Sequence, residues 1–220
     1  QKYQKFMKYK YTYLVMAVIA LFVLTPILEK RFPLIMPILF LALMIAVLGT
    51  LDLRKSLFMI LLGLGVFGFL LSIAAVTSPL SPRELLYLYV AGLSAEALFL
   101  LLAIAVLIMK IFSEKVITAQ TIKGAIAVYF LMGFLWAFLY SILAMLNPEA
   151  ISFPSGSFNF SQITYFSYTT LTTLGYGDVT PVSWMARNLT ILESTFGQLY
   201  VAVLIARLVG LHIATRLKSS

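Results

Sequence analysis

Six long apolar runs dominate this sequence and leave little of it for a soluble core. Each run is close to the length of about 20 apolar residues that a helix needs to cross the hydrocarbon core of a bilayer. The chain is 62% hydrophobic and only 11% charged, whereas soluble domains carry about a quarter charged residues. The sequence therefore predicts an all-α membrane protein. The expected spans are residues 11–28, 33–51, 56–76, 85–109, 124–146 and 188–215.

The positions of Lys and Arg predict how these spans are oriented. With a cytoplasmic N-terminus, twelve of the 16 basic residues fall on the cytoplasmic side, and the other four are Lys30, Arg31, Arg83 and Arg187. Because cytoplasmic loops carry the excess of basic residues, we expect a multi-pass protein of the cell membrane with both termini cytoplasmic. Orientation in the membrane explains the net charge of +8 without a nucleic-acid partner, and membrane lipids are expected to contact the chain.

The interval between the last two predicted spans does not fit a simple loop. Residues 161–172 form an apolar and polar segment of 12 residues, which as a helix would be about 18 Å long, half the thickness of a membrane. A half-helix followed by irregular backbone is tolerated at membrane depth only where protein buries it or where it lines a water-filled path. We therefore expect a re-entrant pore helix between two spans.

Two glycines follow this half-helix at alternate positions, in the run Thr173-Leu174-Gly175-Tyr176-Gly177. A cation that crosses a membrane can exchange its hydration shell for backbone carbonyl oxygens. Aiming successive carbonyls at one axis requires alternating right- and left-handed backbone, and glycine adopts the left-handed form at little cost. The carbonyls of residues 173–176, with the Thr173 hydroxyl, would form oxygen rings where four copies meet.

Residues 172–178, Thr-Thr-Leu-Gly-Tyr-Gly-Asp, resemble the signature of potassium channels, whose usual form has Val in place of Leu174. The resemblance extends from about residue 124 to residue 212. It implies a prokaryotic-type subunit with six transmembrane helices and one pore loop, which assembles as a homotetramer. Its filter, residues 173–177, would bind K⁺ at Thr173, Leu174, Gly175 and Tyr176, and it would need no other cofactor.

The same resemblance implies roles for residues around the filter. Asp178 would brace the outer mouth, and in several members a Glu that pairs with this Asp stands where this chain has Thr169. Aromatic residues, Tyr176 among them, would form a collar that holds the filter open. The residues expected to support the filter are Thr172, Asp178, Tyr165, Phe166 and Tyr168.

Two residues of the last span have alternative interpretations. Gly197 resembles the hinge glycine of the inner helix, and it could instead be a small residue that allows close helix packing. Glu193 is an ionisable group at membrane depth, where such residues face a cavity or a partner. It could concentrate cations in the pore cavity or brace the pore helix from behind.

The fourth predicted span argues against a conventional voltage sensor. Residues 85–109 contain no Arg or Lys, so this span offers no gating charges to respond to the membrane potential. Glu96, in the middle of the span, is expected to be a buried hydrogen-bonding residue rather than part of a second ion path. The sequence does not define the stimulus that opens the channel, which leaves room for a cytoplasmic or accessory regulator.

The sequence thus predicts passive, K⁺-selective conduction, with a less selective monovalent cation channel as the alternative. A transporter would show internal repeats with broken helices, and we find one pore unit. An intramembrane enzyme would need a nucleophile and base or metal ligands, and the chain has no cysteine and one histidine, so we do not expect an enzyme. The predicted segments are a basic N-terminal segment (1–10), a four-helix domain (11–109), a linker (110–123), a pore domain (124–215) and a cytoplasmic tail (216–220).

Overall fold

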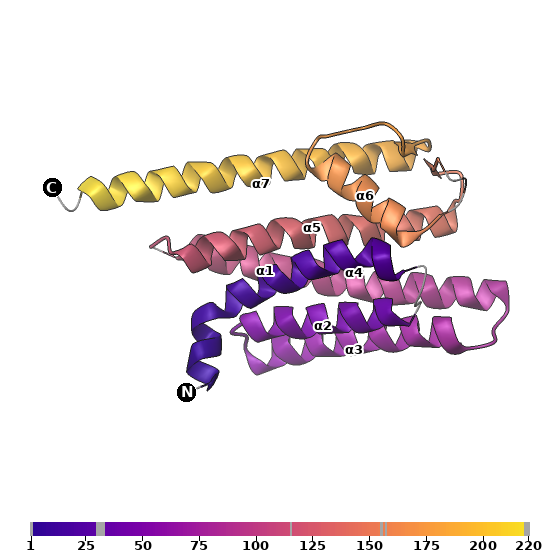
Figure 1. Cartoon of the computed structure of the whole chain (residues 1–220), viewed down its shortest axis with the longest axis horizontal. Helices are drawn as coiled ribbons and strands as arrows, with labels where there is room; N and C mark the ends of the chain where they lie inside the picture. Colours follow the sequence, from indigo (N-terminus) through magenta and orange to yellow (C-terminus); the bar gives the residue numbers. More distant parts are fainter. Residues whose placement is uncertain (1, 30–33, 115, 155, 157, 218–220) are drawn as a thin grey trace.

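The structure, a computed structural model, describes residues 2–29, 34–114, 116–154, 156 and 158–217. Residue 115 of the predicted linker and residues 218–220 of the predicted tail lie outside this part. Most helices run side by side, and α6 crosses the others at one end of the bundle (Figure 1), which we call the outer end. The helices are α1 (Lys2–Leu28), α2 (Ile35–Thr50), α3 (Lys55–Thr77), α4 (Pro82–Ser113), α5 (Ala119–Leu146), α6 (Phe160–Leu171) and α7 (Trp184–Leu217).

Five helices of the described residues are long and apolar enough to cross a membrane, namely α1 from Tyr9 onward, α3, α4, α5 and α7. These coincide with five of the six predicted spans. The exception is α2, which has 16 residues and is about 24 Å long. It is shorter than the expected span 33–51 because it begins only at Ile35, and Pro33 lies outside the described residues.

Local capping residues set where several helices begin. Ser81 and Glu84 form a reciprocal capping box at the start of α4, and Thr118 and Thr121 form a similar pair at the start of α5. The Ser183 hydroxyl accepts a hydrogen bond from the backbone N–H of Ala186 at 3.1 Å, and α7 begins four residues earlier than predicted. Such side chains satisfy backbone donors that no helical carbonyl can reach.

The centre of the bundle is α5, which packs against α1, α4, α6 and α7. Its side chains Phe134, Phe138 and Tyr140 are among the largest that are fully buried. By contrast, α7 exposes a row of large apolar side chains in the single chain. These are Ile191, Leu192, Phe196, Leu199, Val203, Ile205 and Val209.

Two short strands join the loops on either side of α6. β1 (Ile151–Ser152) pairs antiparallel with β2 (Thr180–Pro181), so that Ile151 lies opposite Pro181. The sequence does not predict these strands, since two residues are too few to show an alternating pattern. Their pairing ties together the two ends of the segment that contains α6 and the glycine-rich run.

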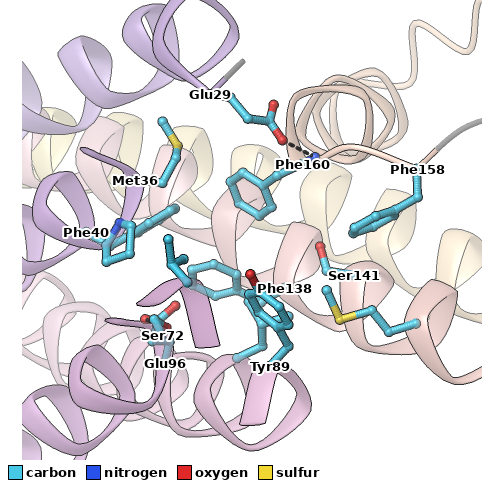
Figure 2. A pocket seen from close by; sticks show the side chains of 14 residues that line it. Glu29, Met36, Phe40, Ser72, Tyr89, Glu96, Phe138, Ser141, Phe158 and Phe160 are labelled. Atoms are coloured by element: carbon cyan, nitrogen blue, oxygen red, sulfur yellow. Dashed lines mark hydrogen bonds between the residues drawn. The ribbon is translucent and has the colours of Figure 1, made fainter. Parts of the chain in front are cut away.

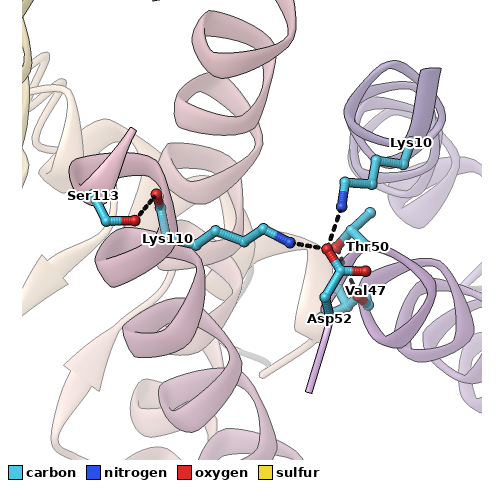
Figure 3. Close-up of polar contacts among 6 residues, drawn as sticks. All are labelled: Lys10, Val47, Thr50, Asp52, Lys110 and Ser113. Atoms are coloured by element: carbon cyan, nitrogen blue, oxygen red, sulfur yellow. Dashed lines mark hydrogen bonds and ion pairs between the residues drawn. The ribbon is translucent and has the colours of Figure 1, made fainter. Parts of the chain in front are cut away.

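Ion pairs join three segments at the inner end of the four-helix group. Lys10 of α1 donates a hydrogen bond to Asp52 Oδ2 at 2.8 Å, and Lys110 of α4 donates to the same oxygen (Figure 3). Asp52 lies between α2 and α3, and its side chain is 56% exposed. The hydrogen bonds from Lys10 and Lys110 lower the pKa of Asp52.

We expect Asp52→Asn to destabilise the protein at neutral pH by up to about 1 kcal/mol, the usual upper value for an exposed ion pair. Because the folded-state pKa is lowered, this stabilisation is present above the pKa of an unfolded Asp, about 3.9. It is lost as the pH falls through the lower pKa of the folded state. Thermal unfolding of the purified protein should therefore show a difference at pH 7 that shrinks below about pH 3.9. The control is Glu149→Gln, an exposed carboxylate; equal melting temperatures at pH 7 for the wild type and Asp52→Asn would contradict the prediction.

Candidate functional site

The site is built around α6, whose first turn is held by a residue distant in sequence. The Glu29 carboxylate accepts hydrogen bonds from the backbone N–H groups of Phe160 (2.6 Å) and Ser161 (2.9 Å), and from the Ser161 hydroxyl. Asn159 caps the same turn by accepting from the N–H of Gln162 at 2.8 Å. A negative charge at this position also interacts favourably with the positive end of the helix dipole. The end of α1 therefore fixes the start of α6.

The backbone after α6 alternates between conformations. Thr173, Gly175 and Gly177 have φ angles of 60°, 54° and 83°, all in the left-handed region. The sequence predicts this conformation at the two glycines. It does not predict it at Thr173, a β-branched residue for which a positive φ costs on the order of 1 kcal/mol or more.

Hydrogen bonds fold this segment back onto the end of α6. The N–H of Thr173 donates to the carbonyl of Thr170 at 3.0 Å, and the N–H of Gly175 donates to the carbonyl of Thr169 at 3.2 Å. In addition, Gln198 of α7 lies with its Nε2 at 3.3 Å from the Thr173 hydroxyl. The strained Thr173 is thus restrained from both sides.

Residues 172–178 are all exposed in the single chain. Leu174 is 60% exposed and Tyr176 is 69% exposed, although both are apolar or aromatic. Irregular backbone of this kind cannot face lipid, because its polar groups would lack partners. At membrane depth, such a segment would have to face either a water-filled path or another polypeptide chain.

Tyr165 connects α6 to the far end of this segment. Its ring stacks on that of Tyr176, with centroids 6.2 Å apart and an interplanar angle of 6°. Its hydroxyl donates a hydrogen bond to Asp178 Oδ1 at 3.0 Å. Asp178 thus finds a partner on α6, while Thr169 is buried and its hydroxyl bonds the Phe166 carbonyl.

Phe166 and Tyr168, also predicted to support the filter, have their ring contacts with other helices. The Phe166 ring lies 5.0 Å from that of Tyr140 in α5. Tyr168 lies between α1 and α5, 4.6 Å from the Phe22 ring, and donates a hydrogen bond to the Phe130 carbonyl at 2.6 Å. These two residues anchor α6 to the bundle, and among the predicted aromatic residues it is Tyr165 whose ring stacks on Tyr176.

Glu193 of α7 is fully buried between α5 and α6. The hydroxyls of Ser167 and Tyr140 each lie 2.6 Å from one of its carboxyl oxygens. The Ser167 hydroxyl also lies 2.8 Å from the carbonyl of Gly133, and its single hydrogen can serve only one of these two acceptors. Both contacts are satisfied if the Glu193 carboxyl is protonated, so that it donates to Ser167 while Ser167 donates to Gly133.

Gly197 lies where α7 passes closest to the end of α6. A Cβ atom at this position would clash with the Leu171 carbonyl oxygen and approach Leu171 Cδ1 to 3.0 Å. The same carbonyl accepts a hydrogen bond from the Tyr129 hydroxyl at 3.1 Å. This geometry agrees with the interpretation of Gly197 as a small residue that allows close helix packing. A role as a hinge stays a hypothesis.

Farther along α7, Arg207 contacts the segment between α4 and α5. Its Nη2 donates to the carbonyl of Glu114 at 2.7 Å, and its Nη1 donates to the carbonyl of Phe112. The guanidinium also lies 4.8 Å from the centre of the Phe112 ring. The inner half of α7 is thus attached to the linker.

A helix, a half-helix, an irregular exposed segment and a second helix follow one another in the order expected of a membrane pore unit. The family model described as "ion channel" matches residues 117–212, which include α5, α6, the irregular segment and α7 as far as residue 212. Residues 117–212 are therefore an ion channel domain. No curated protein matched the sequence.

The contacts that hold α6 at its two ends are not predicted by the sequence. Glu29 appeared only as part of a polar break between two spans, because nothing local links it to Phe160, 131 residues away. Its acidic character on the outer side was the one available signal, since the start of a half-helix needs acceptors. Tyr140 and Ser167 gave no signal, because hydroxyl residues are common in apolar helices.

The geometry around Glu193 predicts different effects for two substitutions. Glu193→Ala leaves two buried hydroxyls without this partner and creates a cavity, which we expect to cost on the order of 3 kcal/mol. Glu193→Gln retains the shape of a protonated carboxyl, since its amide can donate to Ser167 and accept from Tyr140, and should cost much less. Apparent melting temperatures in detergent provide the measurement. Equal losses in both variants would show that Glu193 acts as a charged group.

A substitution at Gly197 separates packing from hinge motion by the sign of its effect. Gly197→Ala should destabilise the protein by about 1–3 kcal/mol, because the new methyl group would force α7 away from α6. If Gly197 were only a flexible hinge, alanine would instead stabilise the helix by about 0.5–1 kcal/mol. Gly210→Ala is the matched control, since a Cβ there meets nothing within 4 Å.

Proposed function

We propose that this chain is one subunit of a K⁺-selective channel in which four copies surround a single pore. The observation that carries the proposal is the left-handed backbone at Thr173, Gly175 and Gly177 directly after a half-helix. In this proposal the carbonyls of residues 173–176, with the Thr173 hydroxyl, replace the hydration shell of K⁺. The ions move passively down their electrochemical gradient.

The exposed surfaces of the single chain support assembly into a tetramer. Residues 172–178 are exposed, and a closed ring of copies would place them around a water-filled axis. The apolar row along α7, including Phe196 and Leu199, would be covered partly by neighbouring copies.

The arrangement of the helices supports six spans in the cell membrane with both termini cytoplasmic. Although α2 is short, it connects the two ends of the bundle, and the first turn of α1 and the last turn of α7 lie at the same end (Figure 1). That requires an even number of crossings. The cytoplasmic side would be the inner end, in agreement with the excess of Lys and Arg there.

Gating in this proposal does not depend strongly on voltage. Between Arg83 near its start and Lys110 near its end, α4 carries no basic residue. Without basic residues along this length, α4 offers no positive gating charges to respond to a change in membrane potential. The alternative function is a less selective monovalent cation channel of the same fold.

The proposal is tested by ion flux in liposomes that contain the purified protein. Vesicles loaded with K⁺ or with Na⁺ are diluted into a medium without that ion, and a pH-sensitive dye with a protonophore reports the efflux. We expect rapid K⁺ efflux and slow Na⁺ efflux. Gly175→Asp should abolish the K⁺ signal, because it adds a side chain at a positive φ of 54° within the filter.

Gly156→Asp is the matched control for this experiment. Gly156 also has a positive φ, 66°, and it lies in the outer loop, where a Cβ atom would meet nothing within 4 Å. This variant should conduct like the wild type. Equal efflux of K⁺ and Na⁺ would favour the less selective channel, and undiminished efflux in Gly175→Asp would overturn the filter assignment.

A further inference from the structure

A cavity of about 400 Å³ lies between the four-helix group and the start of α6 (Figure 2). Helices α2, α3, α4 and α5 form its walls, and Glu29 and Phe160 lie at the side next to α6. Its volume is within the range of about 300–1,000 Å³ that is typical of small-molecule sites. It lies apart from the glycine-rich segment, none of whose residues lines it.

One wall of the cavity carries a buried carboxyl group. Glu96 is only 5% exposed, and its Oε1 accepts a hydrogen bond from the Ser72 hydroxyl at 3.0 Å. Within the described residues, its Oε2 accepts no hydrogen bond and its carboxylate forms no ion pair. A buried carboxylate is stable only when it is paired and hydrogen-bonded. The fold thus leaves one oxygen of Glu96 without a partner at the edge of a cavity.

Aromatic rings form much of the remaining wall. The rings of Phe40 and Phe138 lie 5.0 Å apart, and both contact the ring of Phe160 at centroid distances of 5.5 Å and 5.7 Å. Tyr89 faces the same space. The faces of aromatic rings attract cations, and more strongly where water is excluded.

The charges around the cavity have one sign. Glu29 and Glu96 lie on opposite sides of it (Figure 2), and no Lys, Arg or His is among the described residues that line it. An anion would meet two carboxylates here. An uncharged apolar molecule would leave Glu96 Oε2 without a hydrogen-bond donor. Glu29 is already bonded to the first turn of α6, so Glu96 is the group that remains available.

We propose that this cavity binds a protonated organic amine with an apolar body of arylalkyl size. Its ammonium group donates to Glu96 Oε2, and its body packs against Phe40, Phe138 and Phe160. The amine brings the positive charge that the described residues do not supply to Glu96. A bound amine would contact Phe160, the first residue of α6. Binding of the amine does not require that the protein conducts ions.

The test is calorimetric titration of the purified full chain in detergent with 4-phenylbutylamine, at a constant high concentration of K⁺ that occupies any filter site. The uncharged analogue 4-phenylbutanol is the matched probe. We expect the amine to bind the wild type, and to bind Glu96→Gln at least roughly tenfold more weakly, a difference of about 1.4 kcal/mol. Glu149→Gln removes an exposed carboxylate from the outer loop and should bind like the wild type.

A second variant keeps the carboxyl group and fills the space. Leu93→Trp enlarges a half-buried side chain that lines the cavity, and it should also weaken binding of the amine. If Glu96→Gln does not fold, binding of the amine to Leu93→Trp tests the proposal in its place. The proposal is overturned if the wild type does not bind the amine, if Glu96→Gln binds it equally well, or if the alcohol binds as tightly. The last result would indicate an apolar site for lipid chains.

Discussion

Backbone that is not helical cannot face lipid, and the structure depends on how the chain meets this constraint around residues 172–178. The half-helix α6 ends before the segment begins, so partners outside α6 must satisfy its free groups. Glu29 accepts the N–H groups of its first turn, and Tyr129 donates to the carbonyl of its last residue, Leu171. Both ends of α6 are thus satisfied by residues that belong to spanning helices or follow them directly.

The position of α6 therefore involves nearly the whole chain. α5 lies at the centre of these contacts. Its Tyr140 contacts the Glu193 carboxyl group of α7, and the Ser167 hydroxyl of α6 reaches the same carboxyl group. Tyr168 reaches past α5 to Phe22 of α1. α1 thus packs on α5 and contacts the Tyr168 ring of α6 through Phe22. Glu29, which follows the last turn of α1, holds the start of α6. Consequently, the four-helix group and the ion channel domain share one core instead of meeting only through a linker.

The sequence predicted what depends on local pattern and missed what depends on distant contacts. Long apolar runs predicted five of the spanning helices, and the spacing of Gly175 and Gly177 predicted where the backbone becomes left-handed. Thr173 adopts the same conformation against its own preference, which only its surroundings can impose. Likewise, the capping of α6 by Glu29 joins residues 131 positions apart, and the acidic character of Glu29 alone does not identify its partner.

The distribution of charge distinguishes the two ends of the four-helix group. At the inner end, two lysines neutralise Asp52, so this carboxylate adds stability and leaves no charge available for another partner. In the middle of α4, Glu96 has only the Ser72 hydroxyl as a hydrogen-bond partner among the described residues, and it adjoins a cavity instead of a basic side chain. A conventional voltage sensor carries movable positive charges along such a helix. Here the fold places a fixed acidic group beside a cavity, and Phe160 in the wall of that cavity is the first residue of α6. Any molecule that fills the cavity therefore lies against the helix that precedes residues 172–178.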